Sequence, residues 1–200
     1  MSTTPAVVWQ DSAVRREERW RATRLGGGTV WFTGLSASGK STLADATARL
    51  LADRGRASYL LDGDNLRHHL NADLGFDRAG RAENVRRIGE VARLMADAGL
   101  VTLAPVISPY RADRERVRAI HADAGLSFLE VHVATPLSEC ERRDPKGLYR
   151  LARAGGLPGF TGIDDPYEAP LAPELRLQTT ASPAELATSV LALLDQVEGR

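Results

Sequence analysis

Residues 34 to 41 read Gly-Leu-Ser-Ala-Ser-Gly-Lys-Ser, which has the spacing G-x-x-x-x-G-K-[ST] and stands between an apolar run and a helical pattern. Glycine lets the backbone wrap so closely around an anion that several N–H groups point at phosphate oxygens, and the following helix adds the positive end of its dipole. In such a loop Lys40 would reach the terminal phosphates, and the Ser41 hydroxyl would complete a Mg²⁺ shell. A chain of this composition would contain roughly 0.002 such matches by chance. We therefore expect a site for a purine nucleoside triphosphate.

The phosphate loop alone does not separate kinases from GTPases or motor ATPases. A GTPase would need a guanine-reading N-K-x-D, and the chain has no lysine outside residues 40 and 146 to form one. A motor-type ATPase would show an apolar strand that ends in Asp-Glu, and none of the apolar runs does. Both classes are disfavoured.

Two carboxylates follow the second apolar run, in Asp62-Gly63-Asp64. Carboxylates at the carboxyl edge of a parallel sheet lie where ligands bind in such folds. One of them would hold Mg²⁺ through water or accept a proton from an attacking hydroxyl. The alternative is that Asp62 or Asp64 only caps the next helix. Beside a phosphate loop, we favour a functional role for Asp64.

Cations and aromatic rings suggest what the other substrate carries. Of the 26 basic residues only Lys40 and Lys146 are lysines, and an ammonium and a guanidinium are not interchangeable at a tight site. Four arginines cluster in sequence, as an anion with two charged groups would require: Arg67, Arg81, Arg86 and Arg87. For the last two, a solvated helix face is the favoured alternative. Phe76 and Phe160 fall in polar, glycine-flanked loops, where an exposed ring is more naturally a stacking platform than core.

The elements that must position these residues alternate along the chain. β-branched apolar runs predict strands over 29–35, 57–62, 100–107, 128–134 and 175–179. Longer patterns predict helices over roughly 40–53, 64–73, 81–98, 111–123, 136–143 and 183–197, the last with a capping box at Ser182. This alternation is typical of an α/β fold with a parallel sheet covered on both faces. We expect an N-terminal arm and linker over 1–28, a kinase domain over 29–200, and within it a lid over about 144–174, which is rich in Gly, Pro and charge.

Composition excludes several classes of protein. The chain has 200 residues, and its 26 basic residues balance its 26 acidic ones, which argues against a dedicated nucleic-acid binder. The single cysteine, Cys140, excludes an intrachain disulfide and any multi-cysteine zinc site. No apolar stretch is long enough for a signal peptide or a membrane span. We expect a cytoplasmic protein without a membrane partner.

The sequence resembles the adenylyl-sulfate kinases (APS kinases), within the P-loop kinases of nucleoside-monophosphate-kinase-like fold. The matching motifs are F-T-G-L-S-A-S-G-K-S-T (32–42), D-G-D-N-L-R (62–67), D-L-G-F (73–76), R-A-E-N-V-R-R (81–87), I-S-P-Y-R-A-D-R (107–114), R-D-P-K-G-L-Y (143–149) and G-F-T-G-I-D-D-P-Y-E-A-P (159–170). Their order and spacing agree over about residues 7–179. The last two motifs are far more specific than the phosphate loop.

The resemblance implies ATP-dependent phosphorylation of the 3′-hydroxyl of adenosine 5′-phosphosulfate (APS), giving 3′-phosphoadenosine 5′-phosphosulfate (PAPS) and ADP in sulfate activation. It implies a P-loop NTPase three-layer αβα sandwich with a five-stranded parallel sheet and a mobile lid, Mg²⁺ as cofactor, and a homodimer. ATP would be bound by Gly34, Leu35, Ser36, Ala37, Ser38, Gly39, Lys40, Ser41 and Thr42. APS would be bound by Asp62, Asp64, Arg67, Phe76, Arg81, Asn84, Ile107, Ser108, Lys146 and Phe160. Asp64 and Lys40 would be catalytic, Ser41 and Asp64 would hold Mg²⁺, and Ser108 matches a serine that some members phosphorylate.

Several positions depart from the pattern of this family. Ala37 replaces a loop glycine, His69 replaces a glycine, Gly80 stands where Asp is frequent, and Pro105 interrupts an expected strand. The rival functions are a kinase of the same fold that acts on a nucleoside monophosphate or a sugar acid, and a non-catalytic nucleotide-binding regulator. Because no histidine or lysine stands next to Ser108 as a base, we favour direct phosphoryl transfer over a phosphoserine intermediate.

Overall fold

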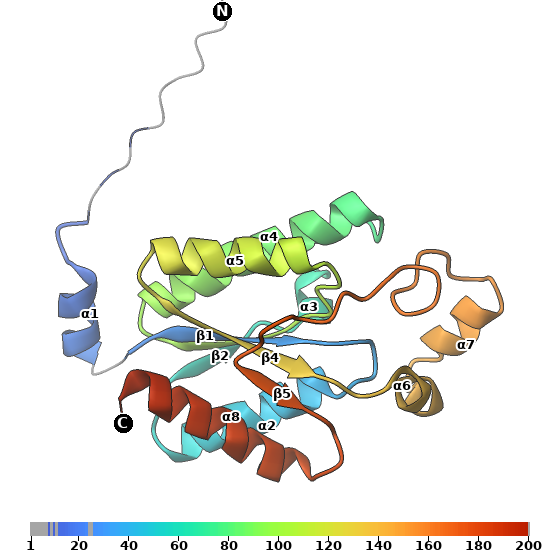
Figure 1. The fold of residues 1–200 in the computed structure, drawn as a ribbon. Helices are drawn as coiled ribbons and strands as arrows, with labels where there is room; N and C mark the ends of the chain where they lie inside the picture. The colour runs from blue at the N-terminus through green and yellow to red at the C-terminus, as the bar shows by residue number, and fades with distance from the viewer. Residues whose placement is uncertain (1–7, 9, 11, 24–25, 200) are drawn as a thin grey trace, which may run out of the picture.

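The structure, a computed structural model, describes residues 8, 10, 12–23 and 26–199. Among these residues, five parallel strands form one sheet in the order β2-β3-β1-β4-β5 (Figure 1). The strands are β1 (Gly28–Thr33), β2 (Ser58–Leu60), β3 (Val101–Pro105), β4 (Ser127–Val133) and β5 (Leu175–Leu177). β1 lies at the centre, where Val30 is level with Leu103 on one side and with Leu129 on the other. The predicted five-stranded parallel sheet is confirmed, so the loops that follow these strands meet at one edge.

Helices cover both faces of the sheet, which confirms the three-layer arrangement. One face carries α2 (Lys40–Asp53) and α8 (Pro183–Glu198), and the other carries α4 (Arg78–Asp97) and α5 (Arg111–Asp123) (Figure 1). Side chains alternate across β1: Val30 and Phe32 enter the apolar core under α2 and α8, whereas Trp31 enters the core under α4 and α5. The predicted capping box of α8 is present, with Ser182 and Glu185 bonded reciprocally.

The helix expected over 64–73 is wrong beyond its first turn. α3 spans only Gly63–Leu66, and the chain continues as turns. The Arg67 guanidinium donates to the carbonyls of Leu74 and Gly75 at 3.1 and 3.2 Å, which folds the segment back on itself instead of letting it extend. Asn71 is fully buried within these turns. Tertiary contacts of this kind override a helical pattern in a short segment.

Pro105 ends β3 rather than interrupting it. It pairs with Phe32 as the last residue of the strand, and Val106 after it still donates to the Phe32 carbonyl at 3.0 Å, so the contact with β1 is kept. The expected strand over 100–107 was therefore too long at its carboxyl end. The other expected strands also overran, most clearly the edge strands β2 and β5, which have three residues each.

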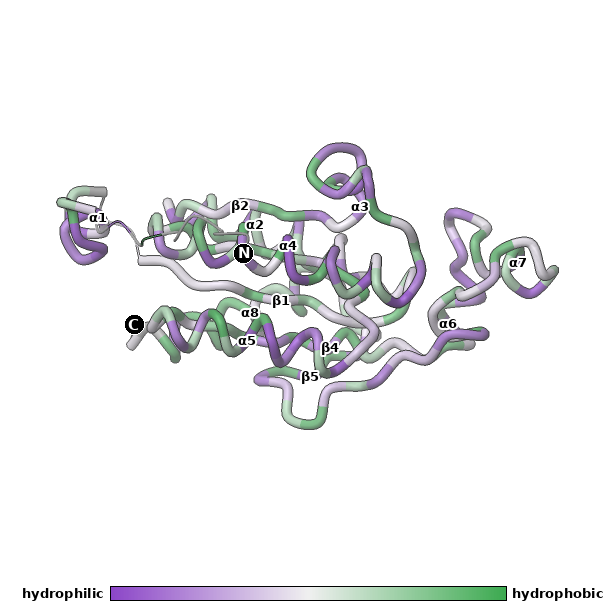
Figure 2. Tube along the Cα trace, turned by 90° about the horizontal axis from the view of Figure 1, so that it is seen from above, coloured by the Kyte–Doolittle hydropathy of each residue, from purple (hydrophilic) through white to green (hydrophobic). Residues whose placement is uncertain are grey.

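The lid segment 144–174 is more ordered than its composition suggests. It contains α7 (Leu148–Arg153), directly after α6 (Leu137–Arg143), and Figure 1 shows both standing away from the sheet. A small apolar cluster joins the two helices to the rest of the lid through Cys140, Tyr149 and Phe160. Figure 2 shows the lid as an alternation of hydrophilic and hydrophobic stretches without a regular period. A six-residue helix is too short to give a recognisable helical periodicity in the sequence.

The arm expected over 1–28 contains a helix, α1 (Arg16–Thr23), that lies against the end of α4. Arg16 Nε donates to Asp97 Oδ1 at 2.6 Å, and Trp20 Nε1 donates to the Asp97 carbonyl at 2.9 Å. Gly27 passes so close to α4 that a Cβ there would lie 1.9 Å from the Ala96 carbonyl oxygen. Residues 1–7, 9, 11, 24 and 25 of the arm lie outside the described residues. Within the described part of the chain, no helix is both long enough and apolar enough to cross a bilayer.

Candidate active site

The phosphate loop is shaped by its backbone. Gly34 has φ 152°, and a Cβ there would come within 2.6 Å of the Val133 carbonyl oxygen, so the loop can lie against β4 only as glycine. Gly39 has φ 100° and caps α2. Ala37, which stands at a usual glycine position, has φ 58°. A left-handed alanine costs on the order of 1 kcal/mol, so Ala37 stores a little strain in the loop.

The other residues of the loop are fixed by neighbours on three sides. Ser38 is fully buried, and its carbonyl accepts from Thr135 Oγ1 at 2.8 Å. The Ser36 carbonyl accepts from the Tyr149 hydroxyl of the lid at 3.1 Å. Leu35 packs against the lid cluster, whereas Thr42 is exposed in the first turn of α2. The loop is therefore held in shape by contacts with Thr135 and with the lid.

Lys40 is buried at the base of this loop. Its Nζ donates to the Leu35 carbonyl at 2.6 Å and lies 3.5 Å from Ser38 Oγ. Burial lowers the pKa of Lys40 to about 8, and the carboxylates of Asp64 and Asp62 only partly oppose this shift. An ammonium held in a partly desolvated loop without an anion gains stabilisation when a phosphate arrives.

The structure gives Asp62 and Asp64 different partners. Ser41 Oγ donates to Asp62 Oδ2 at 2.8 Å, while Asp62 Oδ1 accepts from the backbone N–H groups of Asp64 and Asn65 at 2.9 and 3.3 Å. Asp62 therefore caps α3, as the alternative interpretation held, and also bonds to the phosphate loop. The Asp64 carboxylate is exposed and forms an ion pair with Lys146 of the lid.

The Ser41 hydroxyl and the two aspartates supply hard oxygen donors at one place, the type of ligand that Mg²⁺ prefers. The described residues contain no group of three or more His, Cys, Asp or Glu side chains able to hold a metal ion. Mg²⁺ usually binds through one or two protein ligands, with the rest from water and substrate phosphates. The residues present therefore fit a Mg²⁺ that enters with the nucleotide.

Two of the predicted arginines form the wall opposite the phosphate loop. The Arg67 guanidinium lies 4.2 Å from the centre of the Phe76 ring. Arg81 donates to the Phe76 carbonyl at 2.6 Å and reaches the lid, where Thr161 Oγ1 accepts at 2.7 Å. Burial and the charge of Arg81 lower the pKa of Arg67 from its ordinary value. Such mutual repulsion is relieved by an anion, so this wall is suited to one. Asn84 is buried on α4 and accepts from Asn71 at 3.0 Å.

The other two arginines of the cluster pair with carboxylates on the protein surface. Arg86 bonds to Glu83 at 2.7 Å, and Arg87 bonds to Asp73 at 2.7 Å and to Glu83 at 2.9 Å. These contacts lower the pKa of Glu83 to about 2. The interpretation of Arg86 and Arg87 as an ordinary helix face is confirmed.

The two phenylalanines differ sharply in exposure. The Phe76 residue is 65% exposed, as expected for a stacking platform. Phe160 is only 8% exposed and meets Tyr149 edge-on, with ring centres 5.0 Å apart. The expectation that Phe160 is an exposed loop aromatic is wrong, because its ring closes the apolar cluster of the lid.

Ser108 is buried within the loop that follows β3. Its residue is 1% exposed, and its hydroxyl accepts from Trp31 Nε1 at 3.0 Å and donates to Thr33 Oγ1 at 3.0 Å. Its backbone is left-handed, with φ 41°. Thr33 also donates to the Ile107 carbonyl at 2.8 Å. The main chain of Ile107 and Ser108 is thus held from behind, and the serine hydroxyl is occupied in holding it.

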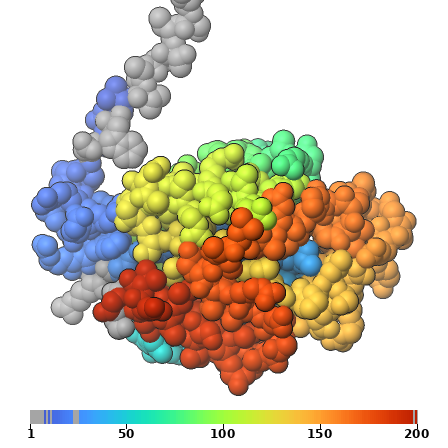
Figure 3. All heavy atoms as spheres, viewed as in Figure 1, coloured from blue at the N-terminus to red at the C-terminus, as the bar shows by residue number. Residues whose placement is uncertain are grey.

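Two hollows adjoin the phosphate loop. One of about 570 Å³ lies between the loop and the lid and is lined by Leu35, Gly162, Ile163, Asp164, Asp165, Pro166 and Tyr167. In Figure 3, blue atoms of the first quarter of the chain are set back between the orange lid and the yellow-orange segment of α6. A second hollow of about 270 Å³ is lined by Thr135, Pro136, Glu139, Arg143, Gln178, Thr179 and Thr180. Neither Arg143 nor Thr179 was assigned a role from the sequence: Arg143 was noted only as the first residue of the 143–149 motif, and no motif marks Thr179 in the loop after β5.

The fold and the cleft can now be compared with known proteins. The family model for adenylylsulphate kinase matches residues 26–178. The chain belongs to this family. A probable adenylyl-sulfate kinase of Halalkalibacterium halodurans is 56% identical over 89% of the chain and 87% of its own length. Adenylyl-sulfate kinase 3 of Arabidopsis thaliana is 52% identical over 94% of the chain and 92% of its length.

A solved structure is similar throughout. The APS kinase CysC of Mycobacterium tuberculosis, in complex with AMPPNP and APS, has a TM-score of 0.84 and 56% sequence identity. The match covers 86% of this chain and 99% of that one. The resemblance seen in the sequence motifs is confirmed, and with it the family's P-loop kinase fold.

Proposed function

We propose that this adenylyl-sulfate kinase transfers the terminal phosphoryl group of ATP to the 3′-hydroxyl of APS, giving PAPS and ADP. The observation that carries the proposal is the position of Asp64. It stands beside Asp62, which bonds the phosphate loop through Ser41, and it pairs with Lys146 of the lid. An exposed carboxylate thereby stands beside the phosphate donor site and in contact with the lid.

The donor side would bind ATP through the backbone of residues 34–42. Lys40 would exchange its bond with the Leu35 carbonyl for phosphate oxygens, and its charge would offset the charge that accumulates as the phosphoryl group leaves ADP. Ser41 and the neighbouring aspartates would hold Mg²⁺, which would supply positive charge close to the phosphates. The hollow between Arg143 and Thr179 adjoins Gly39, where a Cβ would lie 3.1 Å from the Thr179 methyl group, and it is large enough to take part of the nucleoside.

The acceptor side would bind APS by its charge and its ring. Arg67 and Arg81 supply fixed guanidinium groups for the phosphosulfate, and Asn84 is the neutral donor beside them on α4. Phe76 offers an exposed face for the adenine. The burial of Phe160 restricts it to an edge contact or to a contact made after the lid shifts. Selection of APS would thus depend on binding of its phosphosulfate by the two arginines and on stacking of its adenine on Phe76.

The phosphoryl transfer would be direct. The 3′-oxygen of APS attacks the terminal phosphorus, the bond from that phosphorus to the bridging oxygen of ADP breaks, and the hydroxyl proton passes to Asp64. Lys146 must leave Asp64 for this step, and it would then lie near the phosphates. Ser108 is buried with its hydroxyl bonded, which supports direct transfer over a phosphoserine intermediate.

The proposal is tested by incubating the protein with ATP, Mg²⁺ and APS and measuring PAPS and ADP. We expect stoichiometric PAPS and ADP, with AMP and gluconate as poor acceptors because neither carries the phosphosulfate that the two arginines would bind. A Lys40→Ala variant serves as the control for contaminating kinase. Faster phosphorylation of AMP or of gluconate than of APS would overturn the substrate assignment. The homodimer and the cytoplasmic location stay predictions.

A further inference from the structure

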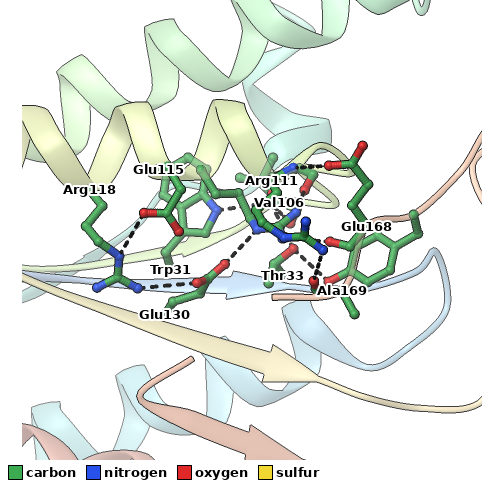
Figure 4. A network of polar contacts seen from close by, with 12 residues as sticks. Trp31, Thr33, Val106, Arg111, Glu115, Arg118, Glu130, Glu168 and Ala169 are labelled. Atoms are coloured by element: carbon green, nitrogen blue, oxygen red, sulfur yellow. Dashed lines mark hydrogen bonds and ion pairs between the residues drawn. The ribbon is translucent and has the colours of Figure 1, made fainter. Parts of the chain in front are cut away.

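Arg114 is a charged residue buried inside the domain, away from both phosphate-binding walls. The residue is only 1% exposed. Its Nε donates to Glu130 Oε1 at 2.6 Å, and its two Nη groups donate to the carbonyl oxygens of Ser108 and Glu168, each at 2.6 Å. Figure 4 shows this network between α5 and the sheet. All three branches of one guanidinium are thus used on three separate segments of the chain.

Glu130 balances the charge of Arg114. It is 2% exposed, and its second oxygen accepts from Arg118 at 3.3 Å. Arg118 is itself held by Glu174 at 2.6 Å and is more exposed than Arg114. A buried ion pair seldom adds much net stability, because desolvation of both charges offsets their attraction. The pair is therefore better explained by what Arg114 holds in place than by stabilisation of the core.

The two carbonyls that Arg114 binds lie in the 107–110 loop after β3 and near the C-terminal end of the lid. Glu168 bonds to that loop twice more: its N–H donates to the Pro109 carbonyl at 2.8 Å, and its carboxylate accepts from the Arg111 N–H at 2.8 Å. The loop itself is strained, because Ser108 is left-handed. Within the described chain, the N–H groups of Ile107 and Ser108 have no acceptor, so both donors are available to a ligand.

We propose that Arg114 is a positioning residue for APS: its guanidinium joins the 107–110 loop to the end of the lid at Glu168, and thereby holds the N–H groups of Ile107 and Ser108 ready for the substrate. The proposal rests on the proposed function, because it assigns these donors to APS. It also places the moving part of the lid before Glu168. Arg114 touches no substrate atom; it acts through the main chain of Ser108.

The test separates the positioning of the loop from the balance of buried charge. The variant Arg114→Met with Glu130→Leu removes both charges together, so no buried charge is left unpaired. We expect this double variant to fold and to show a Michaelis constant for APS raised about tenfold, since two charge-assisted bonds to the loop are gone, with that for ATP within about twofold. The control is Arg118→Met, which removes a neighbouring arginine of the same network that does not bond the loop. Its Michaelis constants should stay within about twofold of wild type.

Arg114→Lys gives a second variant in case the double variant does not fold. Lysine retains the charge beside Glu130 but lacks the planar fork that spans three acceptors, so the constant for APS should again rise while that for ATP does not. Equal Michaelis constants in the wild type and in a folded variant would overturn the proposal, as would equal rises for APS and ATP. A wild-type protein that forms no PAPS would instead refute the proposed function, so the two failures are distinguishable.

Discussion

The phosphate loop and the opposite wall of the cleft are held in place by different means. The loop is shaped by glycine conformations and by bonds between its own main chain and neighbouring hydroxyl groups, as at Gly34 and Ser38. The opposite wall is held by arginine side chains that donate to main-chain carbonyls: Arg67 to Leu74 and Gly75, Arg81 to Phe76 and Gly159, Arg111 to Ala169, and Arg114 to Ser108 and Glu168. The phosphate loop takes its shape mainly from its backbone conformation, whereas the opposite wall depends on long arginine side chains.

Because of this difference, substitutions in the two walls should have different effects on the enzyme. A loop whose shape depends mainly on glycine conformations changes little when one of its own side chains is replaced, so substitutions there should act on the chemistry through the side chain that is lost. A wall held by long side chains can be displaced from a distance, so substitutions there should act on the binding of the acceptor. The comparison predicts losses of turnover on the donor side and losses of APS affinity on the acceptor side.

The largest effect is expected at Lys40. Lys40→Ala should lower kcat by several orders of magnitude, because a cation is lost where charge accumulates in the transition state. Lys40→Arg should not restore activity, since the wider fork cannot fit the buried space that the ammonium occupies. Steady-state rates of the two Lys40 variants, with Arg86→Ala as the surface control, test this prediction. A nearly active Arg variant would show that the loop is less rigid than the comparison assumes.

The next effect tests the residue that stands between the two walls. Asp64→Asn should severely impair transfer, because the amide cannot take the proton of the 3′-hydroxyl. Ser108→Ala should stay within about tenfold of wild type, equivalent to ~1.4 kcal/mol in the barrier. Initial-rate patterns should intersect, as for a ternary complex. Parallel patterns together with an inactive Ser108→Ala variant would establish a covalent intermediate instead.

The two aromatic rings should respond differently, although both were expected to stack on the substrate. Phe76→Ala should raise the Michaelis constant for APS by the equivalent of about 1–3 kcal/mol, with little change for ATP. Phe160→Ala should lower the melting temperature, because truncating a buried aromatic side chain costs about 3–5 kcal/mol. Thermal denaturation and kinetics on both variants test this division. An unchanged melting temperature for Phe160→Ala would show that the ring does not stabilise the apolar cluster of the lid.

The smallest effect is a pH dependence on the donor side. The pKa of Lys40 is about 8 in the ligand-free chain, against 10.5 for an ordinary lysine, and a bound phosphate would raise it again. Above about pH 8, binding must take up a proton, so the affinity for a non-hydrolysable ATP analogue should fall by up to about tenfold per pH unit. The ligand-free fold should gain stability over the same range, since the unfolded chain holds that proton longer. Calorimetric titrations would show the slope, and Lys40→Met should abolish it.

The donor side could be predicted from the sequence, and the acceptor side mainly through resemblance. Residues 34–41 contain the glycines and the Lys-Ser pair that define the phosphate loop within eight positions, so the motif located it. The pairing of Ser41 with Asp62, rather than with Asp64, depends on how α3 turns after β2, which no local pattern shows. The burial of Phe160 depends on α7, a helix too short to give a period. The three acceptors of Arg114 lie on segments far apart in sequence, so no spacing rule could bring them together.

The two lysines of the chain occupy opposite environments. Lys40 is 8% exposed, whereas the side chain of Lys146 is 61% exposed. Acylating reagents attack neutral amines, so the lowered pKa of Lys40 favours its reaction although the amine is covered, whereas Lys146 is open and forms an ion pair with Asp64. In the proposed cycle both amines would move onto phosphate oxygens. A single amine-specific reagent, followed by peptide mass spectrometry, would therefore report on the phosphate loop and on the lid, with one lysine side chain in each.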